Sequence, residues 1–405
     1  MPASSALHEF RPRAEYLGLT AVEPTDASSL YSVPDWSNRI PALDGLRGIA
    51  ILMVFMRHSI FGMETNSKIL APFLTAGQLT WSGVDLFFVL SGFLIGGILL
   101  DAKQSPHYFK TFYIRRAYRI FPLYFLVTGL FLFRHLPFHL IPGPLGDYSP
   151  LSIPLLAYLT LTQNFWMVPV GWFGISSMAA TWSLAVEEQF YLTIPFIIRY
   201  CDRRRLLAVL FSVVFGAPFL RVLLQYFRHG DFACYVLMPC RADALCMGVL
   251  SAIVVRHPGG WRFLKSNRGW LRSVVILLLA GMVYMTCHKY MQLVPPMNTF
   301  GYSWIGLFYA SLLLFVVSDS QGILKRALSN RLLMNLGTLA YCGYLIHVPL
   351  AIAGRRVFAM VFQVSANTSW FLGGMTGIAL TLMIASVSWR FFEKPLLRMG
   401  HKHTY

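Results

Sequence analysis

The first apolar segment, LDGLRGIAILMVFMRHS at residues 43–59, carries side chains that could do chemistry inside a membrane. Arg47 and His58 are eleven positions apart, which places them about 16 Å apart along a helix and about 20° apart around it. Each is a functional candidate, because an ionisable residue in a bilayer is costly. One helix face thus presents an arginine for an anion and an imidazole for proton transfer. The alternative is an arginine that snorkels and a histidine that only bonds a neighbouring helix.

Two adjacent acids, Glu187 and Glu188, lie in the apolar segment TWSLAVEEQFYL. Neighbouring helical residues point about 100° apart, so only one of these carboxylates can face a given cavity. We expect Glu187 to bond the far ring nitrogen of His58, because a carboxylate there fixes the tautomer of a histidine and prepares it as a general base. We expect Glu188 to stabilise the start of its own helix, where negative charge meets the positive end of the helix dipole.

Three arginines, Arg115, Arg116 and Arg119, lie together in FKTFYIRRAYRIFPLYF at residues 109–125. Arg116 and Arg119 share a helix face because they are three positions apart. Guanidinium groups hold phosphate oxygens well, so the cluster predicts a site for a phosphorylated donor. Anchoring of the helix at the cytoplasmic surface explains the same cluster equally well.

Other polar residues in apolar segments each have two interpretations. Arg241 and Asp243 either pair with each other or bind an acceptor from the outer side. Asp85 either pairs with Arg57 or caps its own helix. His347 lies at a similar outer depth to His58, and its pattern is typical of a histidine that bridges two helices.

The composition indicates what kind of elements must position these residues. Of 405 residues, 56% are hydrophobic and 13% are charged, and the mean hydropathy is +0.57. Soluble proteins carry about a quarter charged residues, so these values exclude a disordered chain and an ordinary soluble enzyme. The net charge of +17 would indicate nucleic-acid binding in a soluble protein, whereas in a membrane protein it indicates topology.

Ten apolar segments are long enough to cross a bilayer, which takes about 20 residues per helix. The sequence therefore predicts an all-α, polytopic integral membrane protein with about ten transmembrane helices. The predicted spans are 45–62, 83–100, 119–134, 183–199, 206–228, 236–256, 271–289, 302–319, 334–354 and 370–390.

The distribution of Lys and Arg predicts the orientation. These residues are concentrated in every second loop, which places those loops and both termini in the cytoplasm. Residues 151–167 are also apolar, but Pro154 interrupts them, and a crossing there would turn the basic cluster at 203–205 outward. We therefore expect a re-entrant or interfacial helix in a long outer loop.

We expect three parts: a polar cytoplasmic N-terminal tail at 1–43, a membrane domain at 44–398 and a short cytoplasmic C-terminal tail at 399–405. No apolar stretch follows a basic start, so no cleavable signal peptide is expected. The six cysteines form no CxxC pair and no His/Cys metal spacing, so we expect no metal.

Seven motifs in one order resemble the acyltransferase 3 family of polytopic membrane acyltransferases, over about residues 40–398. A single motif of this kind would be weak, whereas seven in order are specific. The motifs are PALDGLRGIAILMVFMRH, GVDLFFVLSGFLIGGIL, YIRRAYRIFPLY, TWSLAVEEQFYL, RADALCMGVL, YCGYLIHVPL and FFEKPL.

The resemblance implies a ten-helix domain that takes an acyl group, usually acetyl, from cytoplasmic acyl-coenzyme A. Such domains deliver it to a hydroxyl, typically on a sugar of an envelope or exported glycan, and some relatives act on small molecules such as macrolides. The family's functional residues correspond here to Arg47, His58, Arg116 and Arg119. Many relatives carry a fused C-terminal esterase-like domain, which we do not expect in a chain that ends at Tyr405.

The hydropathy pattern predicts a multi-pass membrane protein, and the resemblance implies a protein of the bacterial inner membrane that moves acetyl from acetyl-CoA to a glycan hydroxyl. We expect Arg115 to join Arg116 and Arg119 in holding the donor, and the aromatic ring of Trp172 to stack on the acceptor sugar. The alternative from another class is a proton-coupled anion transporter, which requires two related halves that the sequence lacks. The oligomeric state, monomer or homo-oligomer, stays open.

Overall fold

The computed structural model describes residues 36, 40–61, 70–133, 153–226, 230–290, 292–319 and 322–405, and every regular element within them is a helix. The longer helices of this part are α2 (Pro41–Ser59), α4 (Gly83–Asp101), α5 (Tyr108–Phe133), α8 (Thr181–Tyr200), α9 (Arg203–Tyr226), α11 (Met238–Arg256), α13 (Arg268–Cys287), α14 (Tyr302–Val317), α16 (Arg331–Met360) and α17 (Ala366–Ser388).

Each predicted span coincides with one of these longer helices. Seven of them, α4, α9, α11, α13, α14, α16 and α17, are long and apolar enough to cross a membrane. The other three are α2, α5 and α8, the helices that carry Arg47, Arg116 and Glu187. The all-α, polytopic class is therefore confirmed, and the crossing of all ten helices stays a prediction.

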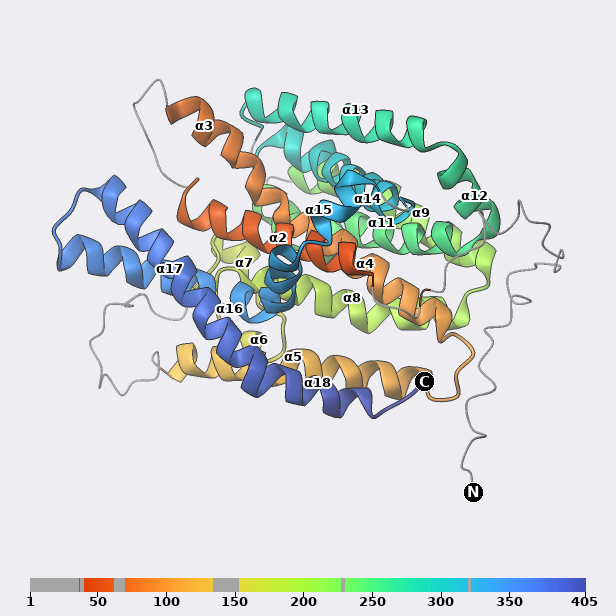
Figure 1. Ribbon diagram of the computed structural model, residues 1–405, viewed down its shortest axis with the longest axis horizontal. Coiled ribbons are helices and arrows are strands. Elements are labelled where there is room, and N and C mark those ends of the chain that lie inside the picture. The colour runs from red at the N-terminus through yellow and green to blue at the C-terminus, as the bar shows by residue number, and fades with distance from the viewer. Residues whose placement is uncertain are drawn as a thin grey trace.

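Shorter helical pieces connect the long ones (Figure 1). They are α3 (Leu70–Gly77), η2 (Gln78–Ser82), α6 (Leu155–Leu159), α7 (Gln163–Val170), η3 (Ser176–Met178), α10 (Gly230–Val236), α12 (Pro258–Ser266), η4 (Met297–Gly301), α15 (Ile323–Leu328), η5 (Trp389–Glu393) and α18 (Lys394–His401).

The segment predicted to be re-entrant contains two of these short helices in its described part, α6 and α7. They have 5 and 8 residues, and each is too short for a crossing that takes about 20. The hydroxyl of Tyr124 donates to the carbonyl of Tyr158 at 2.7 Å, and the amide of Asn164 donates to the carbonyl of Val236 at 3.2 Å. The segment thus packs against α5 and the end of α10, as a broken, non-crossing segment would.

Helix α5 begins at Tyr108, well before the predicted start at residue 119. The basic and aromatic residues that precede the predicted span are part of the helix, and one face of this part packs along α18. In Figure 1 these two helices run side by side at the lower edge of the molecule. Arg116 and Arg119 consequently lie inside a helix, not at its first turn.

The loops predicted to face the cytoplasm meet at one end of the helix bundle. Lys103 Nζ donates to the carbonyl of Cys201 at 2.6 Å, and Arg256 forms an ion pair with Asp101 at 2.7 Å. The guanidinium of Arg256 also lies over the ring of Trp36. Apart from Trp36 and residues 40–43, the predicted N-terminal tail lies outside the described residues.

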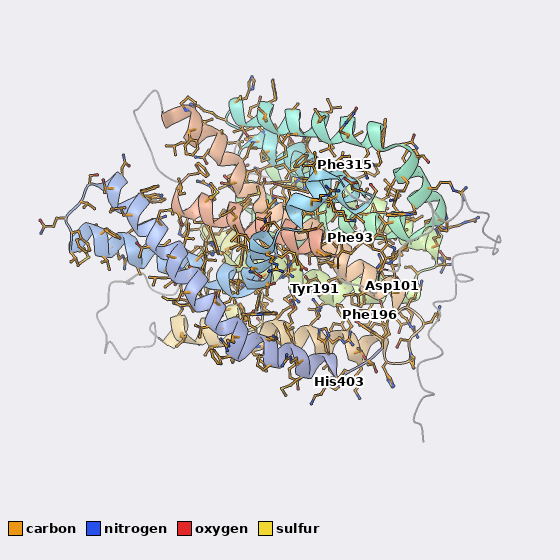
Figure 2. The ribbon with its side chains drawn as sticks, viewed as in Figure 1. Phe93, Asp101, Tyr191, Phe196, Phe315 and His403 are labelled. Carbon is orange, nitrogen blue, oxygen red and sulfur yellow. The ribbon has the colours of Figure 1, made fainter. Side chains whose placement is uncertain are left out.

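The predicted C-terminal tail is helical as far as His401 and packs on α5 (Figure 2). Thr111 Oγ1 donates to the carbonyl of Thr404 at 2.8 Å. The C-terminal residues therefore lie near the start of α5. Which end of the bundle faces the cytoplasm stays a prediction.

Two glycines allow α2 and α16 to approach each other at backbone distance. A Cβ on Gly48 would lie 2.0 Å from the carbonyl oxygen of Leu333, and a Cβ on Gly337 would lie 2.0 Å from that of Asp44. Membrane helices use small residues in this way, because packing rather than hydrophobic exclusion holds them together. The contact fixes the register of α2 against α16.

Substitution of Gly48 by Ala should therefore destabilise the protein, by about 1–3 kcal/mol, since the added methyl forces two backbones apart. The matched control is Gly129→Ala in α5, where a Cβ would meet nothing within 4 Å. Thermal unfolding in detergent should show a lower midpoint for Gly48→Ala and an unchanged or higher one for Gly129→Ala. Equal midpoints would contradict the close α2–α16 contact.

Candidate active site

Helix α2 carries Arg47 near its beginning and His58 near its end, without a break between them. The side chain of Arg47 is 19% exposed, and His58 is exposed at the other end of the same helix. The prediction that one helix presents both residues is confirmed. Because α2 is regular, the separation along its axis is about 16 Å.

Arg47, Arg116 and Arg119 form the first part of the site, which we call the arginine group. Their positive charges act on one another and on the carboxylate of Glu187. Among the described residues, the one ion pair of this group joins Arg47 to Asp44, with 3.9 Å between Nη1 and Oδ1. Within the described residues, neither Arg116 nor Arg119 donates a hydrogen bond, so their N–H groups are free to hold an anion.

Acidic and hydroxyl groups surround the arginine group. Tyr191 Oη donates to Glu187 Oε2 at 3.1 Å and also contacts the hydroxyl of Ser91. Figure 2 shows Tyr191 near the middle of the molecule. Ser388 Oγ donates to Glu393 Oε1 at 3.0 Å, and the charge of Glu393 acts on Arg119. These acids offset the positive charges without occupying the N–H groups.

Glu188 does not stabilise the start of its helix, as we had expected. It lies well inside α8, which begins at Thr181, and its side chain is buried. The charge of Arg116 acts on it. Its Oε1 has no hydrogen-bond partner among the described residues. Glu188 therefore belongs to the surroundings of the arginine group.

The predicted hydrogen bond between Glu187 and His58 is replaced by other contacts. Glu187 bonds Tyr191 and lies with the arginine group near the other end of α2. The ring of His58 instead contacts His347 of α16, with Nδ1 3.3 Å from His347 Nε2. The expected contact fails because α8 brings Glu187 to the depth of Arg47, not to the depth of His58.

His58 is held from several sides at the end of α2. Its Nδ1 lies 2.9 Å from the carbonyl oxygen of Val54, and its own carbonyl oxygen accepts a hydrogen bond from Arg355. The guanidinium of Arg355 in turn stacks on the ring of Trp370, 3.4 Å from its centroid. The prediction that His347 bridges two helices is confirmed, since it joins α16 to α2. Its partner, His58, was not predicted.

Arg115 makes different contacts from Arg116 and Arg119. Its Nε donates to the carbonyl of His403 at 2.8 Å, and its guanidinium lies 5.0 Å from the centroid of the Tyr405 ring. The C-terminal segment thus engages the side chain that we had assigned to the donor.

Arg241 and Asp243 do not pair with each other. Arg241 forms an ion pair with Asp85 of α4, and Asp243 forms one with Arg221 of α9 at 3.0 Å. Both side chains are 1% exposed. The expected mutual pair is therefore wrong, and neither residue is open to an acceptor from outside.

These two ion pairs connect α4, α9 and α11 in the interior of the bundle. Asp243 Oδ2 also accepts from Ser303 Oγ at 2.6 Å, and the Arg241 guanidinium lies 3.9 Å from the centroid of the Tyr302 ring. Asp85 is paired with Arg241 and so links α4 to α11. It neither pairs with Arg57 nor caps its own helix, the two alternatives that the sequence left open. Removal of one partner of such a pair would leave an uncompensated buried charge, so each partner depends on the other helix.

Trp172 lies just after α7 and is 59% exposed. Its ring contacts that of Phe173, which in turn contacts Phe232 and Tyr235. The exposed indole is free to stack on a sugar, and this role stays a prediction.

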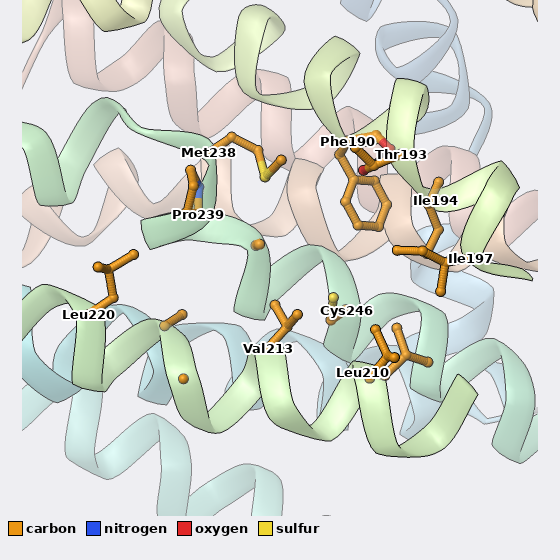
Figure 3. Close-up of a pocket in the computed structure, with 14 residues that line it drawn as sticks. Phe190, Thr193, Ile194, Ile197, Leu210, Val213, Leu220, Met238, Pro239 and Cys246 are labelled. Carbon is orange, nitrogen blue, oxygen red and sulfur yellow. Dashed lines mark hydrogen bonds between the residues drawn. The ribbon is translucent and has the colours of Figure 1, made fainter. Parts of the chain in front are cut away.

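An apolar pocket of about 360 Å³ lies between α8, α9 and α11 (Figure 3). Residues such as Phe190, Leu210 and Met238 line it, and none of its lining residues is charged. It therefore suits hydrocarbon and plays no part in the polar site described above.

The sequence profile described as an acyltransferase domain, that of the acyltransferase 3 family, matches residues 40–390. The chain is 28% identical over 379 residues to the peptidoglycan O-acetyltransferase OatA of Listeria monocytogenes, covering 89% of this chain and 56% of that protein. It is 29% identical over 388 residues to the putative peptidoglycan O-acetyltransferase YrhL of Bacillus subtilis, covering 90% and 56%.

The O-acetyltransferase OatA of Staphylococcus aureus is 24% identical, over 90% of this chain and 58% of that protein. The chain thus spans a little over half the length of these curated relatives. No solved structure shows a significant match. The family profile covers most of the chain, including the arginine group, His58 and the helices that position them, and so this multi-pass membrane protein belongs to the acyltransferase 3 family.

Proposed function

We propose that the protein transfers an acetyl group from acetyl-CoA to a hydroxyl of an envelope glycan. The observation that carries the proposal is the pairing, on one helix, of Arg47 in an arginine group with free N–H donors and of His58 at the opposite end. The relatives named as peptidoglycan O-acetyltransferases support a glycan acceptor.

The donor enters at the arginine group. The phosphates of coenzyme A accept hydrogen bonds from Arg116 and Arg119, and Arg47 adds its charge from α2. Charge-assisted hydrogen bonds of this kind are about twice as strong as neutral ones. The incoming phosphates meet no carboxylate bonded to Arg116 or Arg119 in the described part of the chain, so no strong ion pair has to break first.

The separation of the two ends of the site suits the shape of the donor. The pantetheine arm is about as long as the distance along α2 from Arg47 to His58, about 16 Å. A donor whose phosphates lie at Arg116 and Arg119 therefore brings its thioester to the level of His58. The pantetheine arm of one bound donor thus spans the distance between the arginine group and His58.

At the thioester, His58 acts as the general base. Its free nitrogen takes the proton of the acceptor hydroxyl while the hydroxyl oxygen attacks the thioester carbonyl. The C–S bond then breaks, the ester forms, and the proton passes from the imidazolium to the departing thiolate of coenzyme A. No carboxylate or thiol of the protein needs to be acylated in this sequence.

The acceptor approaches from the His58 end of the bundle. The exposed ring of Trp172 offers a surface on which a sugar can stack. A small-molecule acceptor such as a macrolide is the alternative, and fractionation of labelled products into glycan and small molecules separates the two.

Substitution of Arg116 by Gln should raise the apparent KM for acetyl-CoA about 10-fold, since one charge-assisted hydrogen bond is lost. The double variant with Arg119→Gln should raise it about 100-fold, with little change in kcat. Coenzyme A release from acetyl-CoA by envelope membranes measures both quantities. The matched control is Arg115→Gln, whose guanidinium bonds His403 and should leave KM within about two-fold. An unchanged KM in the double variant would contradict the donor site.

Substitution of His58 by Gln should lower acetyl transfer at least about 100-fold, because it removes the base and keeps a similar volume. Binding of coenzyme A should be unaffected, since the arginine group is intact. His288→Gln is the control, because His288 is exposed and its Nδ1 also lies 2.9 Å from the carbonyl of its own helix, that of Tyr284. Transfer of radiolabelled acetyl into the glycan fraction measures the activity. Full activity of His58→Gln would contradict the role of His58 as general base.

A further inference from the structure

His347 is the one residue that contacts the ring of His58 from another helix among the described residues. It lies in α16 and is 3% exposed. Its Nδ1 is 2.7 Å from the carbonyl oxygen of Tyr344, and its Nε2 is 3.3 Å from His58 Nδ1. The two ring centroids are 4.9 Å apart and the planes meet at 67°. Its partners thus include a backbone carbonyl on one side and the candidate base on the other.

These contacts decide which nitrogens carry hydrogen. A carbonyl oxygen only accepts, so the Nδ1 of His347 must donate to Tyr344, and its Nε2 in the neutral ring is then an acceptor. The Nδ1 of His58 lies 2.9 Å from the carbonyl oxygen of Val54, so it too must carry the hydrogen. The His58 N–H therefore faces two acceptors, the oxygen of Val54 and the Nε2 of His347.

The opposite tautomer of His58 is disfavoured by the same geometry. With the hydrogen on Nε2, the Nδ1 lone pair would face the lone pairs of Val54 and His347, and no hydrogen would lie between them. The native arrangement instead leaves the Nε2 of His58 with its lone pair, and no described residue bonds that nitrogen. Nε2 is the atom that a general base requires.

The geometry points to His347 as a positioning residue that holds His58 in the tautomer with hydrogen on Nδ1, so that Nε2 faces the acceptor hydroxyl. This inference rests on the proposed function. As His58 takes a proton, its Nδ1–H becomes a donor of a cationic ring, and its hydrogen bonds to His347 and Val54 strengthen. His347 thus does with a neutral lone pair what a carboxylate does in a catalytic triad.

The surroundings of the two histidines support this role. The charged side chains that act on His58 are Arg57 and Arg355, and no described carboxylate bonds either imidazole. The ring of Tyr344 lies 5.7 Å from that of His347, and its hydroxyl donates to the carbonyl of Ala180 at 3.1 Å. The residue that immediately precedes α8 therefore braces the turn of α16 that carries His347.

The test compares His347→Gln with His347→Leu. The amide oxygen of Gln replaces the acceptor near Nε2, so this variant should keep kcat within about 10-fold of the native value. Leu fills the space without an acceptor and should lower kcat about 100-fold, with the apparent KM for acetyl-CoA within about two-fold. Rescue by Gln would not be expected if His347 only filled space. Equal losses in both variants, or a loss in KM alone, would overturn the inference.

A double-variant cycle separates this inference from the proposed function. His347→Leu added to His58→Gln should cause no further loss of coenzyme A release, because the residue it positions is already absent. A further loss as large as in the native background would show a purely structural role. If His58→Gln alone is fully active, the proposed function fails; if it is inactive while His347→Leu is fully active, only the role of His347 fails. Thermal unfolding and membrane yield of each variant confirm that it folds.

Discussion

The close packing of α2 against α16 is the constraint on which the rest of the site depends. Gly48 and Gly337 let the two backbones meet near the level of Arg47, and the same pair of helices brings His58 to His347 farther along. Because an α-helix is rigid over this length, fixing the register at one end fixes it at the other. One helix–helix contact therefore sets the positions of both the proposed donor end and the proposed proton-transfer end of the site.

The arginines of the bundle fall into two groups, one buried in ion pairs and one that we propose to bind the donor. Arg221 and Arg241 are almost fully buried and paired with Asp243 and Asp85, so their guanidinium groups hold α4, α9 and α11 together. The arginine group is partly exposed, and its N–H groups are not used by an acid bonded directly to Arg116 or Arg119 in the described chain. The difference lies in exposure, not in the residue type, since the side chains of Arg221 and Arg241 are 0% and 1% exposed whereas that of Arg47 is 19% exposed.

Much of the fold was predictable from the sequence because helices in a membrane must be apolar and of a minimum length. The ten segments, the helix that carries both Arg47 and His58, and the broken segment near Pro154 all follow from that rule. The start of α5 was not predictable in this way, because basic residues such as Lys110, Arg115 and Arg116 interrupt the apolar pattern from Tyr108 onward, and this part of the helix packs on α18.

Partners between helices were the least predictable part of the site. The pairing of Arg241 with Asp85 and the separation of Glu187 from His58 depend on how far each helix is shifted along its neighbour. Hydropathy fixes the length of a segment but not its axial shift. His347 was visible as a polar residue in the apolar motif YCGYLIHVPL, and its depth, similar to that of His58, was the available signal.

In the proposed function, the arginine group and His58 are two ends of one site joined by one bound donor. The most direct measurement is a cryo-EM structure of the protein with an acetyl-CoA analogue whose sulfur is replaced by a methylene group. We expect phosphates on Arg116 and Arg119 and an acyl carbonyl within about 5 Å of His58 Nε2, close enough for a hydroxyl held between them to react. Phosphates bound elsewhere, or a carbonyl far from His58 while the phosphates occupy the arginine group, would contradict it.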